Sequence, residues 1–226
     1  MNLNVIYEDD AILVCHKPAG VATQSRRIGQ QDMESLLRNY RAAKREEPYI
    51  GIVHRLDQPV EGVMVFAKTP KAAANLSAQV QQRTIGKHYY ALVHVDGYEG
   101  PEAGTLDDYL VADRKQNIAS IATAQTTQAK RALLDYQIVE RKQNTALVDI
   151  LLHTGRQHQI RVQFAHAHMP LVGDQKYGRG QENTSLALCS YCLEFTHPGT
   201  GQAMRFQIVP QGAPFRPFLD NIGGRE

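Results

Sequence analysis

Four consecutive residues, His54-Arg55-Leu56-Asp57, place a guanidinium and a carboxylate two positions apart, just before the break at Gln58-Pro59. The composition of residues 49–56 predicts a β-strand, and in a strand Arg55 and Asp57 share one face. A carboxylate at a strand end, beside a loop, suits a reactive group, but it is equally consistent with a surface ion pair. These four residues alone leave both interpretations open.

Two further polar clusters lie where strands end or helices begin. They are Lys87-His88-Tyr89-Tyr90 and Leu152-His153-Thr154-Gly155-Arg156-Gln157-His158-Gln159-Ile160-Arg161. In the longer cluster, His158 and Arg161 are three positions apart, so on a helix they are neighbours. By spacing alone, that cluster is typical of a helix N-terminus whose polar side chains cap and solvate it.

The pattern of apolar and breaker residues predicts the elements that must position these clusters. A helix is expected from Thr69-Pro70 to Gly86, and residues 105–127 are expected to be mostly connection. The other helices are expected at 31–44 and 157–168, and strands at 5–17 (two strands around a turn), 62–67, 87–95, 132–139, 146–152, 185–195 and 202–209. Because strands and helices do not alternate regularly, the order favours one mixed α+β domain over residues 1–226.

The composition fits a folded domain, since 42% of the 226 residues are hydrophobic and 21% are charged. A net charge of +2 permits an anionic partner without requiring one. The chain has no apolar run long enough for a membrane helix and no N-terminal signal pattern, so we expect neither a membrane span nor a secretory leader.

Three cysteines suit a reducing cytoplasm better than a disulfide framework. Cys189 and Cys192 form a CxxC pair, which in other contexts binds zinc or performs redox chemistry. A zinc site would need a second pair of ligands at a set spacing, and none follows. We therefore interpret the pair as two cysteines in the strand 185–195 and expect no metal.

The three clusters, in this order and at these separations, resemble the motifs of the RluA-like family of pseudouridine synthases. The family's HRLD motif, followed by a glycine and an apolar strand, corresponds to residues 54–69. Its K-x-Y-x-A-x-V and L-x-T-G-R-x-H-Q-I-R motifs correspond to residues 87–93 and 152–161. The family's GD..YG motif corresponds to Gly173-Asp174 and Tyr177-Gly178. The opening of the chain, Tyr7-Glu8-Asp9-Asp10 with Lys17-Pro18-Ala19-Gly20, also fits the family.

The resemblance covers about residues 5–209 and implies the family's fold, a mainly antiparallel sheet with flanking helices and a central catalytic cleft. One departure lies beside the HRLD motif, where the family usually has Thr-Ser and this chain has Val60-Glu61. The sequence also lacks the small N-terminal S4 domain of many relatives, so we expect it to begin directly with the catalytic domain.

Pseudouridine synthesis breaks the N1–C1′ bond of a uridine in RNA, turns the uracil and rejoins it through C5. The resemblance implies that Asp57 is the catalytic nucleophile, a role that carboxylates perform in retaining glycosidases. It implies that Arg161 pairs with Asp57 and holds it ionised. It implies that Tyr89 lies against the uracil and helps to remove the C5 proton. The atom that Asp57 attacks is left open.

A stacked uridine must be flipped out of the RNA to be reached, and the resemblance implies that Arg55 fills the vacated space. Arg156 and His158 are expected to contact RNA, although a structural hydrogen bond explains His158 equally well. No cofactor is implied, because the isomerisation needs no redox step or energy input. The expected partner is structured ribosomal or transfer RNA, and the expected protein is a cytoplasmic monomer.

Two rival functions follow from the same residues. A non-catalytic RNA-binding protein could keep this fold, but such a protein would have no need for Asp57, Tyr89 and Arg161 together. A metal-dependent hydrolase could use the histidines with Asp57 or Asp174, but the chain has no HExxH-like spacing. Loss of activity with a chelator would favour the hydrolase, and Asp57-dependent release of the uridine C5 hydrogen from RNA would favour the synthase.

Overall fold

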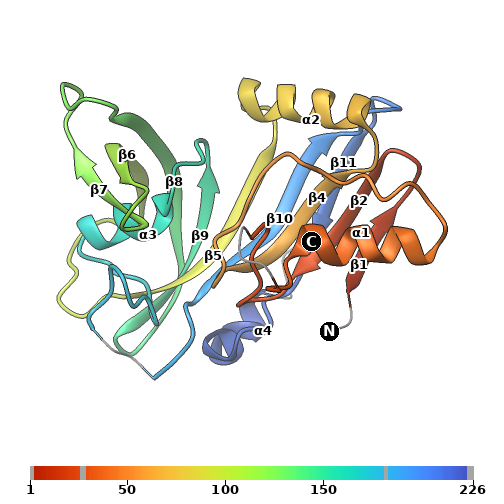
Figure 1. Cartoon of the computed structure of the whole chain (residues 1–226). Helices are drawn as coiled ribbons and strands as arrows, with labels where there is room; N and C mark the ends of the chain where they lie inside the picture. The colour runs from red at the N-terminus through yellow and green to blue at the C-terminus, as the bar shows by residue number, and fades with distance from the viewer. Residues whose placement is uncertain (1–2, 26–28, 181–182, 223–226) are drawn as a thin grey trace. The chain divides into compact units, whose positions relative to one another are not determined.

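The chain forms two compact units in a computed structural model that describes residues 3–25, 29–180 and 183–222 (Figure 1). Unit 1 comprises Met1–Gly86 and Ser190–Ile208, and unit 2 comprises Lys87–Cys189 and Val209–Glu226. The α+β class is as predicted. That residues 1–226 act as one catalytic domain stays a prediction.

Unit 1 contains a mainly antiparallel sheet with two helices. Its strands neighbour one another in the order β1 (Asn4–Glu8), β2 (Ile12–Lys17), β4 (Glu61–Ala67), β10 (Leu188–Thr196, of which the first two residues belong to unit 2) and β11 (Ala203–Gln207), and the short β3 (Gly51–Ile52) pairs with β4. The helices are α1 (Met33–Ala43) and α2 (Pro70–Gln82).

Helix α2 covers one face of this sheet. Its Leu76 is fully buried in a cluster with apolar residues of three strands, among them Val14, Val65 and Leu193. The helix begins as predicted, because the Thr69 side chain accepts a hydrogen bond from the backbone N–H of Ala72. The predicted end at Gly86 is wrong.

The end of α2 is made by Arg83, which takes a left-handed conformation at φ 59°. A left-handed residue stops a helix even when it is not glycine, because the next N–H groups then turn back onto the last carbonyls. Gly86 instead begins β5.

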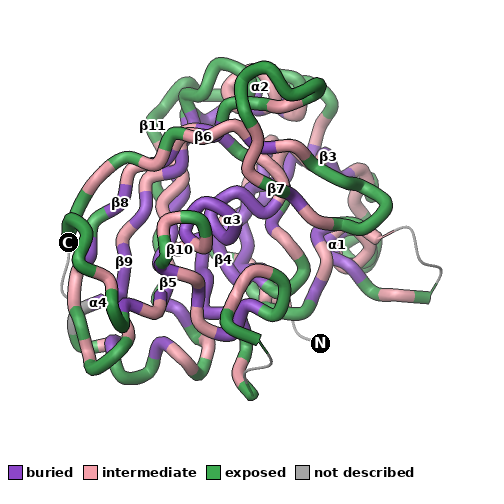
Figure 2. Tube along the Cα trace, turned by 90° about the vertical axis from the view of Figure 1, so that its left-hand side faces the viewer, coloured by how far each residue is buried: buried purple, intermediate pink, exposed green. Residues whose placement is uncertain are grey.

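Unit 2 contains a second antiparallel set of strands around a buried helix. The order is β5 (Gly86–His94, of which Gly86 belongs to unit 1), β9 (Thr145–Leu152), β8 (Lys130–Lys142), β6 (Ala103–Asp113) and β7 (Ile118–Ala122). Helix α3 (Gln159–His166) is coloured as buried in Figure 2. A 3-10 helix, Ala213–Phe218, and the single turn α4 (Leu219–Ile222) end the unit.

The prediction that residues 105–127 are mostly connection is wrong, because they contain most of β6 and all of β7. Strand β6 pairs with β8 from Ala103 opposite Gln137 to Leu110 opposite Lys130. Most of its residues are exposed or half-buried. Cross-strand pairing, rather than an apolar pattern, therefore creates this strand.

The predicted strand 49–56 is also wrong, because only Gly51–Ile52 is extended within the sheet. In residues 53–56, hydrogen bonds between side chains and backbone replace the backbone pairing of a β-sheet. The Val65 N–H donates to Nε2 of His54 at 3.2 Å, and Thr23 binds both backbone groups of Leu56. Arg55 and Asp57 therefore do not share a strand face.

No helix of the described residues is long and apolar enough to cross a membrane.

Candidate active site

Asp57 begins a tight turn in unit 1. The backbone N–H of Val60 donates to the Asp57 carbonyl at 3.0 Å, and β4 starts at the next residue, Glu61. The Asp57 side chain is half-buried, whereas that of Arg55 is exposed. This turn presents a carboxylate that is constrained by its backbone and still reachable from solvent.

Side chains and backbone of the segment around Gly20 brace both flanks of Asp57. Before it, the buried Thr23 hydroxyl accepts from the Leu56 N–H at 3.2 Å and donates to the Leu56 carbonyl at 3.1 Å. After it, the Gly20 N–H donates to the Gln58 carbonyl at 2.8 Å, and the Gln58 amide donates back to the Gly20 carbonyl at 3.0 Å.

A fully buried lysine, Lys17, lies under this turn. Its Nζ donates to three backbone carbonyls, of Val21 at 2.6 Å, Pro18 at 3.1 Å and Gln58 at 3.2 Å. Burial lowers the pKa of Lys17 to about 8, and the charges of Asp57 and Glu61 act in the opposite direction. In the sequence, Lys17 stands out only as part of the motif Lys17-Pro18-Ala19-Gly20. The available signal was a lysine at the end of a strand whose first four residues, Ile12–Cys15, are apolar.

The glycine that follows the HRLD motif has a steric reason. Gly62 lies at φ 153°, and a Cβ there would be 2.5 Å from the Ser190 Cβ and 2.6 Å from the Ser190 carbonyl oxygen. Strand β10 thus approaches β4 more closely than any side chain at this position would allow. The start of β4, and with it the turn that carries Asp57, depends on this approach.

In unit 2, Arg161 makes a bidentate ion pair with Asp174. The guanidinium Nε and Nη2 donate to the two carboxylate oxygens at 2.7 and 2.6 Å, and both residues are buried. Asp174 also accepts the backbone N–H groups of Lys176 and Tyr177 at 2.9 and 3.2 Å. Burial by itself would raise the pKa of Asp174, but Arg161 and these N–H groups hold that pKa below its usual value.

Tyr177 joins Arg161 to His158. The Arg161 guanidinium lies 5.2 Å from the centre of the Tyr177 ring, and the Tyr177 hydroxyl is hydrogen-bonded to His158 Nδ1 at 2.7 Å. The same hydroxyl accepts the Ala119 N–H at 2.8 Å. His158 therefore has the structural hydrogen bond that was one of its two interpretations. It precedes α3 in a left-handed conformation at φ 52°, and its side chain makes no cap bond.

The threonine and glutamine of the third motif fasten the start of α3 to β8. The Thr154 hydroxyl accepts the Leu133 N–H at 2.8 Å and donates to Gln159 Oε1 at 2.7 Å. The same oxygen accepts the Arg156 N–H at 3.0 Å, and Arg156 Nε donates to the Arg131 carbonyl at 2.9 Å. Buried polar groups thus satisfy one another around this helix start.

The structure brings some predicted site residues together and leaves others to prediction. Arg161 and His158 meet at Tyr177, and Tyr89 is a buried residue of β5 opposite Ile150. Asp57 belongs to unit 1 and Arg161 to unit 2, so their pairing stays a prediction. Within unit 2 the bidentate partner of Arg161 is Asp174, which the sequence analysis did not assign to it.

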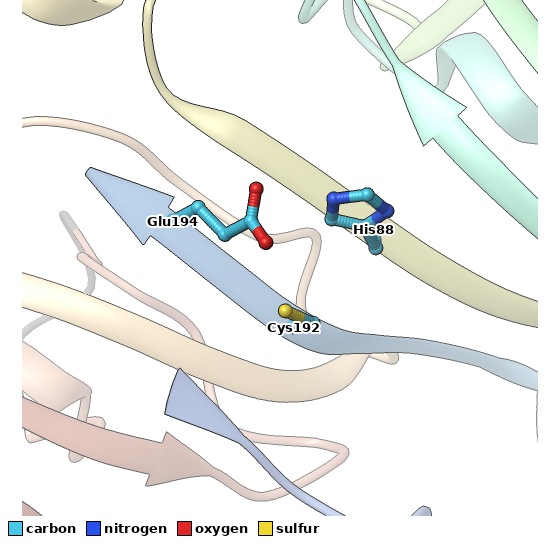
Figure 3. Close-up of side chains that lie close together, drawn as sticks. All are labelled: His88, Cys192 and Glu194. Carbon is cyan, nitrogen blue, oxygen red and sulfur yellow. The ribbon is translucent and has the colours of Figure 1, made fainter. Parts of the chain in front are cut away.

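The CxxC pair lies in β10 and Cys15 lies in β2, and all three cysteines are buried and form no disulfide. Residues three apart point to opposite faces of a strand, so Cys189 and Cys192 do not converge on one ligand. Cys192 and Glu194, two residues apart, project from the same face (Figure 3). His88, the third side chain labelled there, belongs to β5.

The chain is similar in sequence to known proteins. A family model described as RNA pseudouridylate synthase matches residues 11–166. The ribosomal large subunit pseudouridine synthase D of Nitrosomonas europaea is 33% identical over 91% of this chain and 61% of its own length. An RNA pseudouridine synthase of Bacillus subtilis, YlyB, is 32% identical over 98% of this chain and 73% of its own length.

A solved structure titled human RNA pseudouridylate synthase domain containing 1 has the same fold. It superimposes with a TM-score of 0.75 at 24% identity, covering 97% of this chain and 86% of that one. The motifs, the fold and the family match together place the chain in the RNA pseudouridylate synthase family, to which it belongs. It spans 61% of the length of the Nitrosomonas relative.

Proposed function

We propose that the chain is an RNA pseudouridine synthase with Asp57 as its nucleophile. The observation that carries this proposal is the position of Asp57, a half-buried carboxylate at the family's motif position on a turn braced by Lys17 and Thr23. A braced carboxylate loses little freedom when it enters a transition state. The relatives named as ribosomal large subunit synthases favour a uridine of ribosomal RNA over one of transfer RNA.

The reaction balances without a cofactor. The N1–C1′ bond breaks while Asp57 assists the departure of the uracil, the base turns, and C5 forms the new bond to C1′. C5 then loses its proton and N1 gains one, so the product is an isomer of the substrate. We therefore propose no metal, nucleotide or redox group.

Arg161 is proposed to pair with Asp57 and to keep it ionised and oriented. Its support is the bidentate bond to Asp174, which fixes the guanidinium through Nε and Nη2. Tyr89 is proposed to lie against the uracil and to help remove the C5 proton.

Three further residues are proposed to contact the RNA. Arg55 is exposed one residue before the buried Leu56, so it is suited to fill the space left by a flipped uridine. Arg156 and His158 lie at the start of α3, where His158 also keeps its structural bond to Tyr177. We further propose that residues 1–226 act as one catalytic domain, as a monomer in the cytoplasm, where ribosomal RNA is found.

The test is release of tritium from RNA that carries [5-³H]uridine. Asp57→Asn should abolish release, by at least about a thousandfold, while RNA binding and thermal stability stay close to wild type. Asp10→Asn, which changes an exposed carboxylate of the same unit, is the matched control and should keep full activity. An active Asp57→Asn variant would remove Asp57 from the mechanism.

The alternative is a non-catalytic RNA-binding protein on the same fold. It predicts that the wild-type protein binds RNA, with affinity that falls as salt rises, but releases no tritium from any ribosomal or transfer RNA. The presence of Asp57, Tyr89 and Arg161 together favours the enzyme.

A further inference from the structure

A second buried pair of ionisable side chains lies at the base of the Asp57 turn. His16 and Glu61 are 4% and 5% exposed, and His16 Nε2 lies 3.5 Å from Glu61 Oε2. His16 precedes Lys17 at the end of β2, and Glu61 is the first residue of β4 after the turn. The pair therefore joins the two strands from which the Asp57 turn and its bracing segment emerge.

Two contacts, one at Lys17 and one at His16, thus hold the turn at its base. The Lys17 ammonium binds the carbonyl of Gln58, one residue after Asp57. Antiparallel pairing sets Lys17 opposite Gly62 and His16 opposite Val63, so the His16–Glu61 contact lies one step from Lys17 along the same two strands.

Packing by itself does not explain why this pair is buried. Burying ionisable groups removes their hydration, and an apolar residue in place of such a pair is often neutral or stabilising. His16 Nε2 also makes no hydrogen bond within the described residues, so its partner there is the Glu61 carboxylate at ion-pair distance. Glu61 also departs from the Thr-Ser that the resembling family usually has at residues 60–61, so the pair belongs to this chain.

We propose that Glu61 is a positioning residue for the isomerisation: with His16 it fixes the start of β4, and its negative charge supports the Lys17 ammonium that holds the Asp57 turn. The inference rests on the proposed function. The charges that act on the pKa of Lys17 are those of Asp57 in the turn, Glu61 in β4 and Cys15 in its own strand. Of these groups, Asp57 and Glu61 are carboxylates, and Glu61 is the one that chemistry does not require.

The experiment compares Glu61→Gln with wild type in the tritium-release assay at saturating RNA. The variant keeps the shape of the side chain but not its charge, so kcat should fall at least about tenfold while KM changes less than about twofold. Loss of the charge also lowers the pKa of Lys17, so the alkaline limb of the kcat–pH profile should move to lower pH. Glu61→Asp, which restores the charge, should recover most of the lost kcat. It should also return the alkaline limb of the kcat–pH profile to its wild-type position.

Glu8→Gln is the matched control. Glu8 also binds a buried lysine, Lys68, at 2.8 Å, but just beyond the opposite end of β4. This variant should lower the melting temperature without moving kcat or the pH profile. If Glu61→Gln behaves like Glu8→Gln, or if Glu61→Asp recovers nothing, Glu61 is not a positioning residue. Absence of release by the wild-type protein would instead overturn the proposed function, so the two failures are distinguishable.

Discussion

Arg161 is held on two sides within unit 2, by the carboxylate of Asp174 and by the ring of Tyr177. Removing the partner of such a residue destabilises the fold, because the buried charge then loses the bonds that replaced its hydration. The pair therefore fixes the direction of a guanidinium that we propose to act on Asp57. It has a measurable consequence for stability.

Asp174→Asn should lower the free energy of unfolding by about 3–5 kcal/mol, because it leaves Arg161 buried without its counter-charge. Asp107→Asn is the control: Asp107 pairs with Arg131 at 2.6 Å on the exposed surface, so its loss should cost less than about 1 kcal/mol. Urea unfolding at neutral pH measures both. Equal losses would show that the buried pair contributes no more than a surface one.

The same measurement has a pH dependence with a definite sign. The native pKa of Asp174 is lowered from its usual 3.8, so its contribution is complete above that value. As pH falls below 3.8 and through the lower native pKa, the advantage of wild type over Asp174→Asn should shrink. A difference that persists undiminished at lower pH would contradict the ion-pair explanation.

At the scale of elements, the close approach of β10 to β4 places the turn that carries Asp57. Gly62→Ala should destabilise the protein by about 3 kcal/mol, because its Cβ meets the backbone of Ser190 as well as its side chain. Gly97→Ala is matched in its positive φ, 74°, but its Cβ would have no neighbour within 4 Å.

The Gly97 variant should therefore cost only the backbone strain, about 1 kcal/mol. Thermal unfolding of the two variants separates the contact from the strain. If they lose the same stability, the approach of Ser190 does not constrain Gly62.

Several elements were predictable from sequence because local patterns specify them. Thr69-Pro70 starts α2 through a cap and a fixed φ, and both act within one turn of helix. Strand β6 was missed because all its residues but Leu110 are exposed or half-buried, and its paired residues in β8 lie 20 to 34 positions further along the chain. The segment 53–56 was misassigned to a strand because the side chain of Thr23, distant in sequence, makes the hydrogen bonds to the Leu56 backbone that a neighbouring strand would make.

At the scale of the whole molecule, the net charge of +2 conceals an uneven distribution. Several exposed arginines are paired with carboxylates, as Arg131 is with Asp107 and Arg179 with Asp96. Arg114 and Lys115, in the exposed turn between β6 and β7, have no ion pair among the described residues. That turn is fastened to the third motif, since Gln157 donates to the Asn117 side chain at 2.9 Å.

Replacing Arg114 and Lys115 by glutamine should weaken RNA binding and reduce the slope of log affinity against log salt by between about 1.4 and 1.8, as expected for two lost phosphate contacts. Lys71→Gln with Arg83→Gln removes the same charge from exposed positions of α2 and its cap, and is the control. Filter binding at several salt concentrations measures the slope. Equal slopes for the two double variants would show that the effect comes from net charge and not from phosphate contacts of Arg114 and Lys115.

The sequence by itself determined the family, the α+β class and the candidate residues, because these follow from motif order and from patterns that act over a few positions. The tertiary structure decided which buried groups support them. Three contacts show this: Lys17 with the carbonyl of Gln58, His16 with Glu61, and Arg161 with Asp174. Their partners lie from 13 to about 45 positions apart in the sequence. Such pairings depend on strand register and on burial, and neither is specified by the local spacing of residues.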